Sequence, residues 1–302
     1  MRAALAAEVL GSVKIKIDDI RTVAVLGSGT MGSGIAHVFA RSGYTVILRD
    51  IDKRFLDRAL ESIGKNLDRE IKKGKFAAEQ KPQILARIQP VTDMAAIASA
   101  DFAIEAVPER LDLKREVLAQ ADRILRPEAI LATNTSSISI TELGAATNRP
   151  DCFLGMHFMN PVPVMPLVEV IRSKQTSDAA FDVTMQLCKK LDKTPVAVND
   201  SPGFVSNRVL MPLINEAAFC VMEGVATAEA VDTVMKLGMN HPMGPLELAD
   251  FIGLDVCLDI MNVLQKGFGG DAKYRPCPLL QEMVAAGRLG KKSGRGFYVY
   301  EK

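Results

Sequence analysis

The chain has 302 residues, of which 48% are hydrophobic and 24% charged, a composition that excludes a disordered or fibrous protein. The 37 Lys and Arg residues balance the 36 Asp and Glu residues, so the overall charge favours neither nucleic acid nor an anionic membrane as a partner. Five scattered cysteines without a C-x-x-C pair argue against a zinc site or a disulfide framework, and no apolar run reaches the ~18 residues of a membrane span. We therefore expect a cytoplasmic protein of one large or two medium domains, without a metal site.

Short apolar runs alternate with helical patterns through the first two-thirds of the chain. Residues 1–18 are expected to form a tail, and residues 52–75 a charged helical arm after the second strand. The expected strands are 22–27, 44–50, 101–107, 129–133, 152–158, 167–171 and 195–198. Continuous apolar strands separated by helices are typical of a parallel sheet that is covered on both faces. Residues 19–199 are thus predicted to form a doubly wound, mostly parallel α/β domain of the Rossmann type.

The pattern changes near residue 200, which is the predicted domain boundary. Helical patterns follow at 204–222, 228–237 and 246–264, and no strand of comparable quality lies between them. Residues 200–302 are therefore expected to form an all-α C-terminal domain, whose size is sufficient for independent folding.

A glycine-rich turn follows the first predicted strand and opens the first predicted helix. It fits the pattern G-x-G-x-x-G, and its residues are Gly27, Ser28, Gly29, Thr30, Met31 and Gly32. The first glycine permits the tight turn, the second lets the backbone approach a pyrophosphate, and the third lets the helix pack on the sheet. Asp50 ends the next predicted strand, where a carboxylate accepts hydrogen bonds from ribose hydroxyls and repels a 2′-phosphate. The motif in this context predicts NAD as the cofactor.

Among the three histidines, His157 is the strongest candidate for proton transfer. It ends an apolar run, a proline-rich turn follows, and the next strand carries one carboxylate, Glu169, among apolar residues. A strand–turn–strand return can bring the two side chains together, and the carboxylate would then fix the tautomer of the imidazole. On spacing alone, a structural His–Glu pair or two unrelated residues stay open as alternatives.

Two further polar segments are candidate parts of a site. Ser136 lies in a serine-rich turn at the carboxyl end of a predicted strand, where ligands of open α/β sheets bind. Asn207 opens the long apolar helix after the predicted domain boundary. Helix capping is the structural alternative for the serine-rich turn, and a hinge or interface hydrogen bond is the alternative for Asn207.

The sequence from about Arg21 to the C-terminus resembles the short-chain L-3-hydroxyacyl-CoA dehydrogenase family, which includes bacterial 3-hydroxybutyryl-CoA dehydrogenases. Six motifs carry the resemblance in order, at residues 27–32, 134–137, 157–169, 200–208, 241–247 and 290–298. The resemblance implies NAD-dependent, reversible oxidation of a short-chain (S)-3-hydroxyacyl-CoA, such as 3-hydroxybutyryl-CoA, to the 3-oxoacyl-CoA. It also implies a homodimer that is built through the helical domain.

The resemblance assigns roles to single residues as well. It implies that His157 and Glu169 form the catalytic pair, and that Ser136 and Asn207 bind the substrate. The implied cofactor contacts outside the glycine turn are Asp50, Glu109, Lys114, Ser136, Asn160 and Lys292.

The charged arm is a candidate contact for coenzyme A, because CoA carries phosphates that need cations. In the family a helical arm contacts CoA through a serine and a lysine. Lys73 matches the lysine, whereas Asn66 stands where the serine would be, a difference that bears on affinity rather than on substrate class. An ordinary solvated helix face explains the charged side chains equally well.

Two other functions share much of the pattern. L-gulonate 3-dehydrogenases have the same fold, cofactor and much of the catalytic pattern, and a lens crystallin of the family is a non-catalytic NADH-binding protein. The basic arm and the complete segment from His157 to Glu169 favour acyl-CoA. The four intact candidate residues of the reacting centre argue against lost activity.

Overall fold

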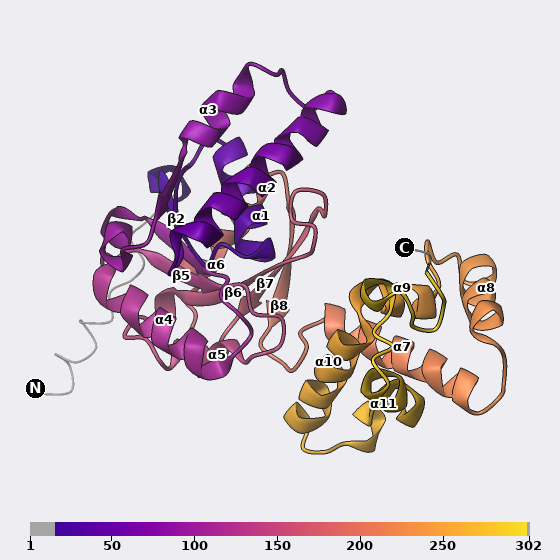
Figure 1. The fold of residues 1–302 in the computed structure, drawn as a ribbon. Helices are drawn as coiled ribbons and strands as arrows, with labels where there is room; N and C mark the ends of the chain where they lie inside the picture. Colours follow the sequence, from indigo (N-terminus) through magenta and orange to yellow (C-terminus); the bar gives the residue numbers. More distant parts are fainter. Residues whose placement is uncertain (1–15, 301–302) are drawn as a thin grey trace, which may run out of the picture. The chain divides into compact units, whose positions relative to one another are not determined.

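The computed structural model describes residues 16–300, and its backbone contacts divide the chain into two compact units. One unit extends to Asp200 and the other begins at Ser201. All labelled strands belong to the first unit, and helices alone are labelled in the second (Figure 1).

The first unit is built on one eight-stranded sheet with the order β3-β2-β1-β4-β5-β6-β7-β8. Its strands are β1 (Thr22–Leu26), β2 (Thr45–Arg49), β3 (Ile88–Val91), β4 (Phe102–Glu105), β5 (Ile130–Thr133), β6 (Phe153–Phe158), β7 (Leu167–Arg172) and β8 (Thr194–Asn199). Neighbouring strands are parallel except β6 and β7, which pair antiparallel. The predicted Rossmann-like, mostly parallel sheet is confirmed.

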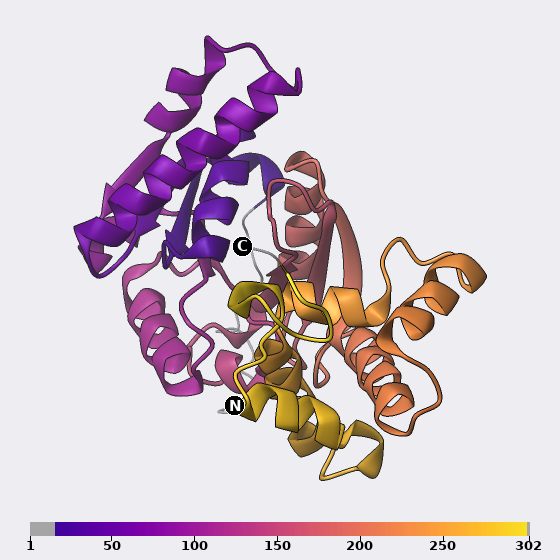
Figure 2. The same ribbon diagram turned by 45° about the vertical axis from the view of Figure 1, so that its right-hand side comes forward.

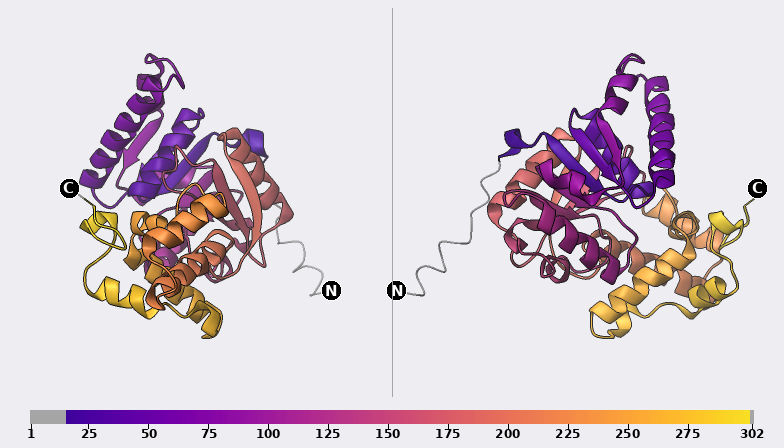
Figure 3. Two further views of the ribbon diagram at one scale, coloured as in Figure 1. Left: turned by 90° about the vertical axis from the view of Figure 1, so that its right-hand side faces the viewer. Right: turned by 60° about the vertical axis from the view of Figure 1, so that its left-hand side comes forward.

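Helices cover both faces of this sheet (Figure 3). They are α1 (Thr30–Arg41), α2 (Lys53–Lys72), α3 (Gln80–Ala86), α4 (Leu111–Ile124), α5 (Ile140–Gly144) and α6 (Asp178–Lys190), with 3₁₀ turns at Ile17–Asp19, Met94–Ser99 and Pro150–Cys152. Side chains of α1, α2 and α6 share one hydrophobic core with alternate residues of the strands. On the other face α4 contacts β4 and α5 contacts β6.

Local sequence explains the two elements that frame the nucleotide site. In β1 the four residues from Val23 to Leu26 are fully buried, which is why the strand is continuously apolar rather than alternating. Helix α2 is amphipathic, because its buried residues recur every three or four positions while charged residues occupy the rest. The side chain of Asp52 caps α2 by accepting a hydrogen bond from the backbone N–H of Arg54.

Two elements of the first unit lie outside the sequence prediction. Strand β3 was not expected, because two of its four residues, Gln89 and Pro90, are untypical of an apolar strand. It forms the edge of the sheet, where the missing N–H of a proline is tolerated. The predicted arm 52–75 contains α2 and is extended by the shorter α3, which lies beside it (Figure 3). The turn after α2 passes through Gly74 at φ 69°, a conformation that favours glycine.

The second unit is all-helical, as predicted. Its helices are α7 (Ser206–Met222), α8 (Ala228–Gly238), α9 (Pro245–Ile252), α10 (Leu254–Gly267) and α11 (Pro278–Ala285), with 3₁₀ turns at Ala272–Tyr274 and Lys291–Ser293. They enclose a hydrophobic core of their own. Figure 2 shows these helices, coloured orange to yellow, gathered as one bundle.

Two buried carboxylates organise the end of the chain in this unit. Asp232 accepts hydrogen bonds from the backbone N–H groups of Leu246 and Glu247, at the start of α9. Asp250 accepts hydrogen bonds from the backbone N–H groups of Phe297 and Tyr298. The sequence motifs at 241–247 and 290–298 therefore supply the backbone N–H groups that satisfy these two buried carboxylates, which is a structural role.

Candidate active site

The glycine turn connects β1 to α1, and each glycine has a separate structural role. Gly27 has φ 101°, and a Cβ atom there would lie 2.7 Å from the carbonyl oxygen of Ala106. At Gly32 a Cβ atom would lie 1.8 Å from the carbonyl oxygen of Gly27, so only glycine allows α1 to pack this closely on the turn. Gly29 precedes α1 as its N-cap residue, and Thr30 and Met31 form the first turn of the helix.

Asp50 lies beside this turn, as the nucleotide prediction requires. Its Oδ2 atom accepts hydrogen bonds from the backbone N–H and from the hydroxyl of Ser28, each at 2.7 Å. Its Oδ1 atom accepts a hydrogen bond from the backbone N–H of Ile51. The carboxylate is thus fixed at the carboxyl end of β2 beside the N-terminus of α1.

The turn fits the pyrophosphate of a dinucleotide. A Cβ atom at Gly29 would meet no other atom within 4 Å, so neither internal packing nor a positive φ explains a glycine there. Close approach of a ligand to the backbone does explain it. The N-terminus of α1 supplies N–H groups and a positive dipole end for the phosphates.

His157 and Glu169 form a hydrogen-bonded pair on adjacent strands. The antiparallel register of β6 and β7 places the two residues directly opposite each other. His157 Nδ1 lies 2.8 Å from Glu169 Oε2, and both residues are buried. Because the ring uses Nδ1 for the carboxylate, Nε2 is the nitrogen that can exchange a proton with a substrate.

Ser136 is positioned by the carboxylate of Glu109, which follows β4. One oxygen of Glu109 accepts hydrogen bonds from the backbone N–H of Ser136 at 2.9 Å and from Ser137, and it accepts the hydroxyl of Thr135 at 2.5 Å. Partial burial raises the pKa of Glu109, but the Lys114 ammonium, 3.2 Å away, and these hydrogen bonds outweigh burial and hold that pKa below its usual value. The carboxylate stays charged and fixes the turn that carries Ser136.

The ammonium of Lys114 is buried, and in this structure its hydrogen-bond partners are protein oxygens. The residue is 1% exposed, and Nζ donates to Glu105 Oε1 at 2.8 Å and to the carbonyl oxygen of Val107. Glu105, at the end of β4, also accepts the hydroxyl of Thr133 at 2.6 Å. Glu105 was not among the predicted site residues, although it is a single carboxylate in an apolar strand, the same signal that identified Glu169.

The serine-rich turn lies close to the pair formed by His157 and Glu169. Asn134, which begins that turn, accepts a hydrogen bond from the backbone N–H of Phe158 at 2.9 Å. Phe158 directly follows His157 on β6. The ends of β5 and β6 are therefore held together beside the imidazole.

Asn160 lies exposed in the loop between β6 and β7, and a buried lysine holds this loop. Lys193 Nζ donates to the carbonyl oxygens of Val162 at 2.6 Å and of Met165 at 2.7 Å. Burial, followed by the positive charges of Arg41 and Lys75, lowers the pKa of Lys193 from 10.5 to about 8. No signal in the sequence distinguished this lysine from surface lysines.

This low pKa predicts a pH dependence of stability. Between pH 8 and 10.5 the unfolded chain keeps a proton on Lys193 that the folded protein has released, so the free energy of unfolding gains a positive slope with pH. Relative to Lys193→Met, the wild type should therefore gain stability across this window and show a constant difference below pH 8. Denaturant unfolding at a series of pH values measures this, and a constant difference throughout would contradict the assignment.

The remaining predicted contacts lie on the arm and in the second unit. Asn66, on α2, accepts a hydrogen bond from Arg69 at 3.0 Å, and Lys73 lies exposed at the end of α2. Within the second unit Asn207 lies in the first turn of α7, and Lys292 Nζ donates to Asp255 Oδ2 at 2.6 Å. The roles of these residues toward cofactor and substrate stay predictions.

Comparison with known families identifies both units. The profile of the 3-hydroxyacyl-CoA dehydrogenase NAD binding domain matches residues 22–201, and that of the 3-hydroxyacyl-CoA dehydrogenase C-terminal domain matches residues 203–300. The chain belongs to the 3-hydroxyacyl-CoA dehydrogenase family. This family member is an NAD-dependent oxidoreductase, and its first unit is the NAD binding domain.

Individual relatives in the family are similar over nearly the whole chain. A probable 3-hydroxybutyryl-CoA dehydrogenase of Deinococcus radiodurans is 55% identical, covering 91% of this chain and 99% of its own length. The 3-hydroxybutyryl-CoA dehydrogenase of Bradyrhizobium diazoefficiens is 50% identical, covering 93% and 96%. The crystal structure of (S)-3-hydroxybutyryl-CoA dehydrogenase from Ralstonia eutropha matches with a TM-score of 0.91 at 51% identity, covering 94% of this chain and all of that one.

None of the helices formed by residues 16–300 combines the length and the apolar character that crossing a membrane would need.

Proposed function

We propose that this family member catalyses the reversible oxidation of (S)-3-hydroxyacyl-CoA to 3-oxoacyl-CoA, with 3-hydroxybutyryl-CoA as a short-chain substrate. The observation that carries the proposal is the buried hydrogen bond between His157 and Glu169 in an NAD binding domain. The names of relatives that are 50–55% identical support the choice of substrate.

The chemistry assigned to the chain is proton transfer. His157 Nε2 takes the proton of the 3-hydroxyl group, and Glu169 holds Nδ1 and stabilises the imidazolium that forms. The glycine turn and Asp50 would hold NAD⁺, which would supply the acceptor for the hydride that leaves carbon 3. In the reverse direction the imidazolium returns its proton to the oxygen of the 3-oxo group.

The positioning of the substrate is assigned to Ser136 and to Asn207. Each side chain can donate a hydrogen bond to a substrate oxygen and so orient the reacting carbon. The charged Glu109 accepts hydrogen bonds from the backbone N–H of Ser136 at 2.9 Å and from its hydroxyl at 3.3 Å. The backbone bond fixes the turn, and the hydroxyl turns from Glu109 to the substrate oxygen when it donates there. Asp50, Glu109, Lys114, Asn160 and Lys292 are proposed to act on the cofactor side.

The substrate class is tested by measuring NADH consumption with competing substrates. We expect turnover of acetoacetyl-CoA that exceeds turnover of longer 3-oxoacyl-CoAs and of dehydro-L-gulonate. A preference for dehydro-L-gulonate would replace the acyl-CoA assignment with the sugar-acid one. Tight NADH binding without turnover of any of these compounds would support a non-catalytic role.

The arm is proposed to bind CoA through Lys73 together with Asn66. Changing Lys73 to glutamate reverses a charge at the end of α2, so KM for acetoacetyl-CoA should rise by about tenfold or more while NADH affinity stays constant. Steady-state kinetics measure the KM, with Lys53→Glu at the other end of the same helix as the matched control. An unchanged KM would remove Lys73 from the CoA site.

We also propose a cytoplasmic homodimer that is formed through the second unit. Large apolar side chains are exposed on its helices, since Val209, Leu237 and Phe251 are 66%, 83% and 62% exposed. The five cysteines are free thiols, as is usual in a reducing compartment. Light scattering distinguishes the dimer from a monomer.

A further inference from the structure

A cavity in the first unit lies away from the glycine turn. It has a volume of about 610 Å³, within the usual range for small-molecule sites. Its lining comes from the end of α1, the turn between α2 and α3, α3 itself and the turn before β8. Arg41 is the last residue of α1 and Thr30 the first, so a helix of roughly 18 Å separates the cavity from the proposed pyrophosphate site.

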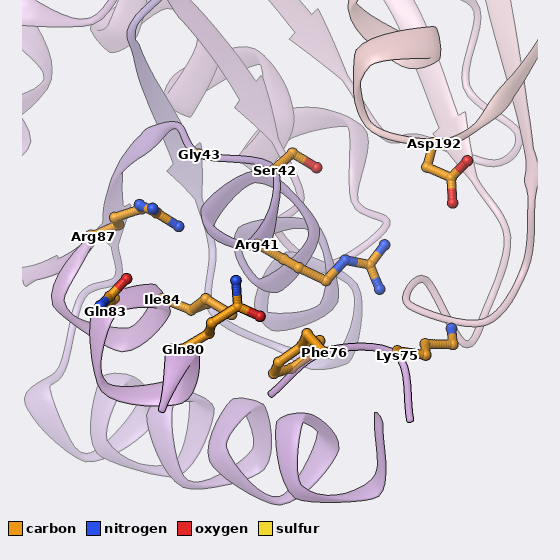
Figure 4. A pocket seen from close by; sticks show the side chains of 10 residues that line it. All are labelled: Arg41, Ser42, Gly43, Lys75, Phe76, Gln80, Gln83, Ile84, Arg87 and Asp192. Atoms are coloured by element: carbon orange, nitrogen blue, oxygen red, sulfur yellow. The ribbon is translucent and has the colours of Figure 1, made fainter. Parts of the chain in front are cut away.

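Positive charge predominates in this cavity. Arg41, Lys75 and Arg87 line it, together with one carboxylate, Asp192. Figure 4 shows the guanidinium of Arg41 and the ammonium of Lys75 turned toward the same space as the carboxylate of Asp192.

The partners of these cations do not cancel their charge. Arg41 and Lys75 share one carboxylate, Glu70, at 2.5 and 3.5 Å, and Glu70 is also 3.1 Å from His37. The guanidinium of Arg87 donates to the carbonyl oxygen of Ala40, which carries no formal charge. The positive charges of Arg41 and Lys75 also help to lower the pKa of the neighbouring Lys193, after the larger effect of burial, which is consistent with a positive potential in this region.

The other lining groups suit a ligand that carries hydroxyl or amino groups and an apolar part in addition to an anionic group. Gln80 and Gln83 can donate or accept hydrogen bonds, and Asp192 can accept them from hydroxyl or amino groups. Phe76 and Ile84 add an apolar wall, and the ring of Phe76 offers a flat surface for stacking. Arginine and lysine together favour phosphate, whose oxygens accept several charge-assisted hydrogen bonds.

We propose that this cavity binds a small phosphate ester that carries hydroxyl groups, of the size of a nucleoside monophosphate, separately from the dinucleotide and CoA. The phosphate contacts Arg41 and Lys75, the hydroxyl groups donate to Asp192, and a ring or carbon skeleton lies against Phe76. None of its lining residues is assigned to catalysis or to NAD, and the two proposed CoA contacts on the arm, Asn66 and Lys73, do not line it.

Calorimetric titration of the full-length protein, saturated with NADH and CoA, tests the proposal. The probes are AMP, ribose 5-phosphate and inorganic phosphate. Both esters should bind more tightly than inorganic phosphate, and Lys75→Ala should weaken ester binding roughly tenfold, as expected for a lost charge-assisted hydrogen bond. Lys81→Ala removes the same charge from α3 outside the cavity and should leave binding unchanged.

A second variant tests the role of the hydroxyl groups. Asp192 has φ 57°, a conformation that asparagine tolerates, so Asp192→Asn should keep the fold. It removes repulsion of the phosphate and the strongest acceptor for hydroxyl groups, so the affinity ratio of ribose 5-phosphate to inorganic phosphate should fall. An unchanged ratio, equal effects of Lys75→Ala and Lys81→Ala, or ester binding that disappears when CoA is present would each overturn the proposal.

Discussion

Replacing His157 with alanine should lower kcat by about 10³-fold while the affinity for NADH stays within twofold, roughly, of the wild type. The imidazole of His157, hydrogen-bonded to Glu169, provides a nitrogen that can accept a proton at neutral pH, and alanine provides none. The side chain is buried beside a structural hydrogen bond, so the thermal midpoint of the variant must be measured together with kcat. NADH fluorescence titration provides the binding constant.

Glu169→Gln is the matched variant for this prediction. Glutamine keeps the size of the side chain and can still contact Nδ1, but it does not stabilise the imidazolium. We expect a fall in kcat that is substantial but smaller than that of His157→Ala. A His157→Ala enzyme that retains near-wild-type kcat would show that another group accepts the proton.

Gly29→Ala should weaken NADH binding by roughly tenfold to hundredfold without lowering thermal stability. In the protein itself the new methyl group would meet no atom within 4 Å, and the backbone of Gly29 has an ordinary negative φ. The space is therefore free until a pyrophosphate approaches the backbone, and the cost of the methyl group arises only in the complex. Fluorescence titration and a melting curve on the same sample separate the two effects.

Gly32→Ala is the contrasting variant three residues later. Its methyl group would lie 1.8 Å from a backbone oxygen of Gly27, so α1 must move away from the turn before any ligand binds. The expected loss is about 3 kcal/mol or more of stability, together with the loss of NADH affinity. Equal stabilities of the Gly29→Ala and Gly32→Ala variants would contradict the roles assigned to the two glycines. Gly64→Ala, in the open on α2, serves as the control.

The sequence by itself determined the elements whose signal is local. Strand β1 is continuously apolar because both its faces are buried. The three glycines after it have the G-x-G-x-x-G spacing that is typical of a dinucleotide-binding turn. The pair of His157 and Glu169 could be predicted because a short return between two strands leaves few registers, and each residue was a single polar group in an apolar run. The change from alternating elements to helices near residue 200 was visible for the same reason.

Tertiary structure alone decided the features that depend on residues far apart in the chain. Pro90 argues against a strand locally, and β3 exists because β2 offers it a parallel partner at the edge of the sheet. Lys193 has the sequence character of a surface lysine, yet its ammonium group donates to the carbonyl oxygens of Val162 and Met165, which lie 31 and 28 residues away in the chain. The cavity lined by Arg41, Lys75 and Arg87 brings residues at the ends of α1 and α3 close to Asp192. Their spacing along the chain does not predict that they lie together. Periodicity reports which side of an element is buried, whereas the partners of a buried charge are set only when separate elements pack together.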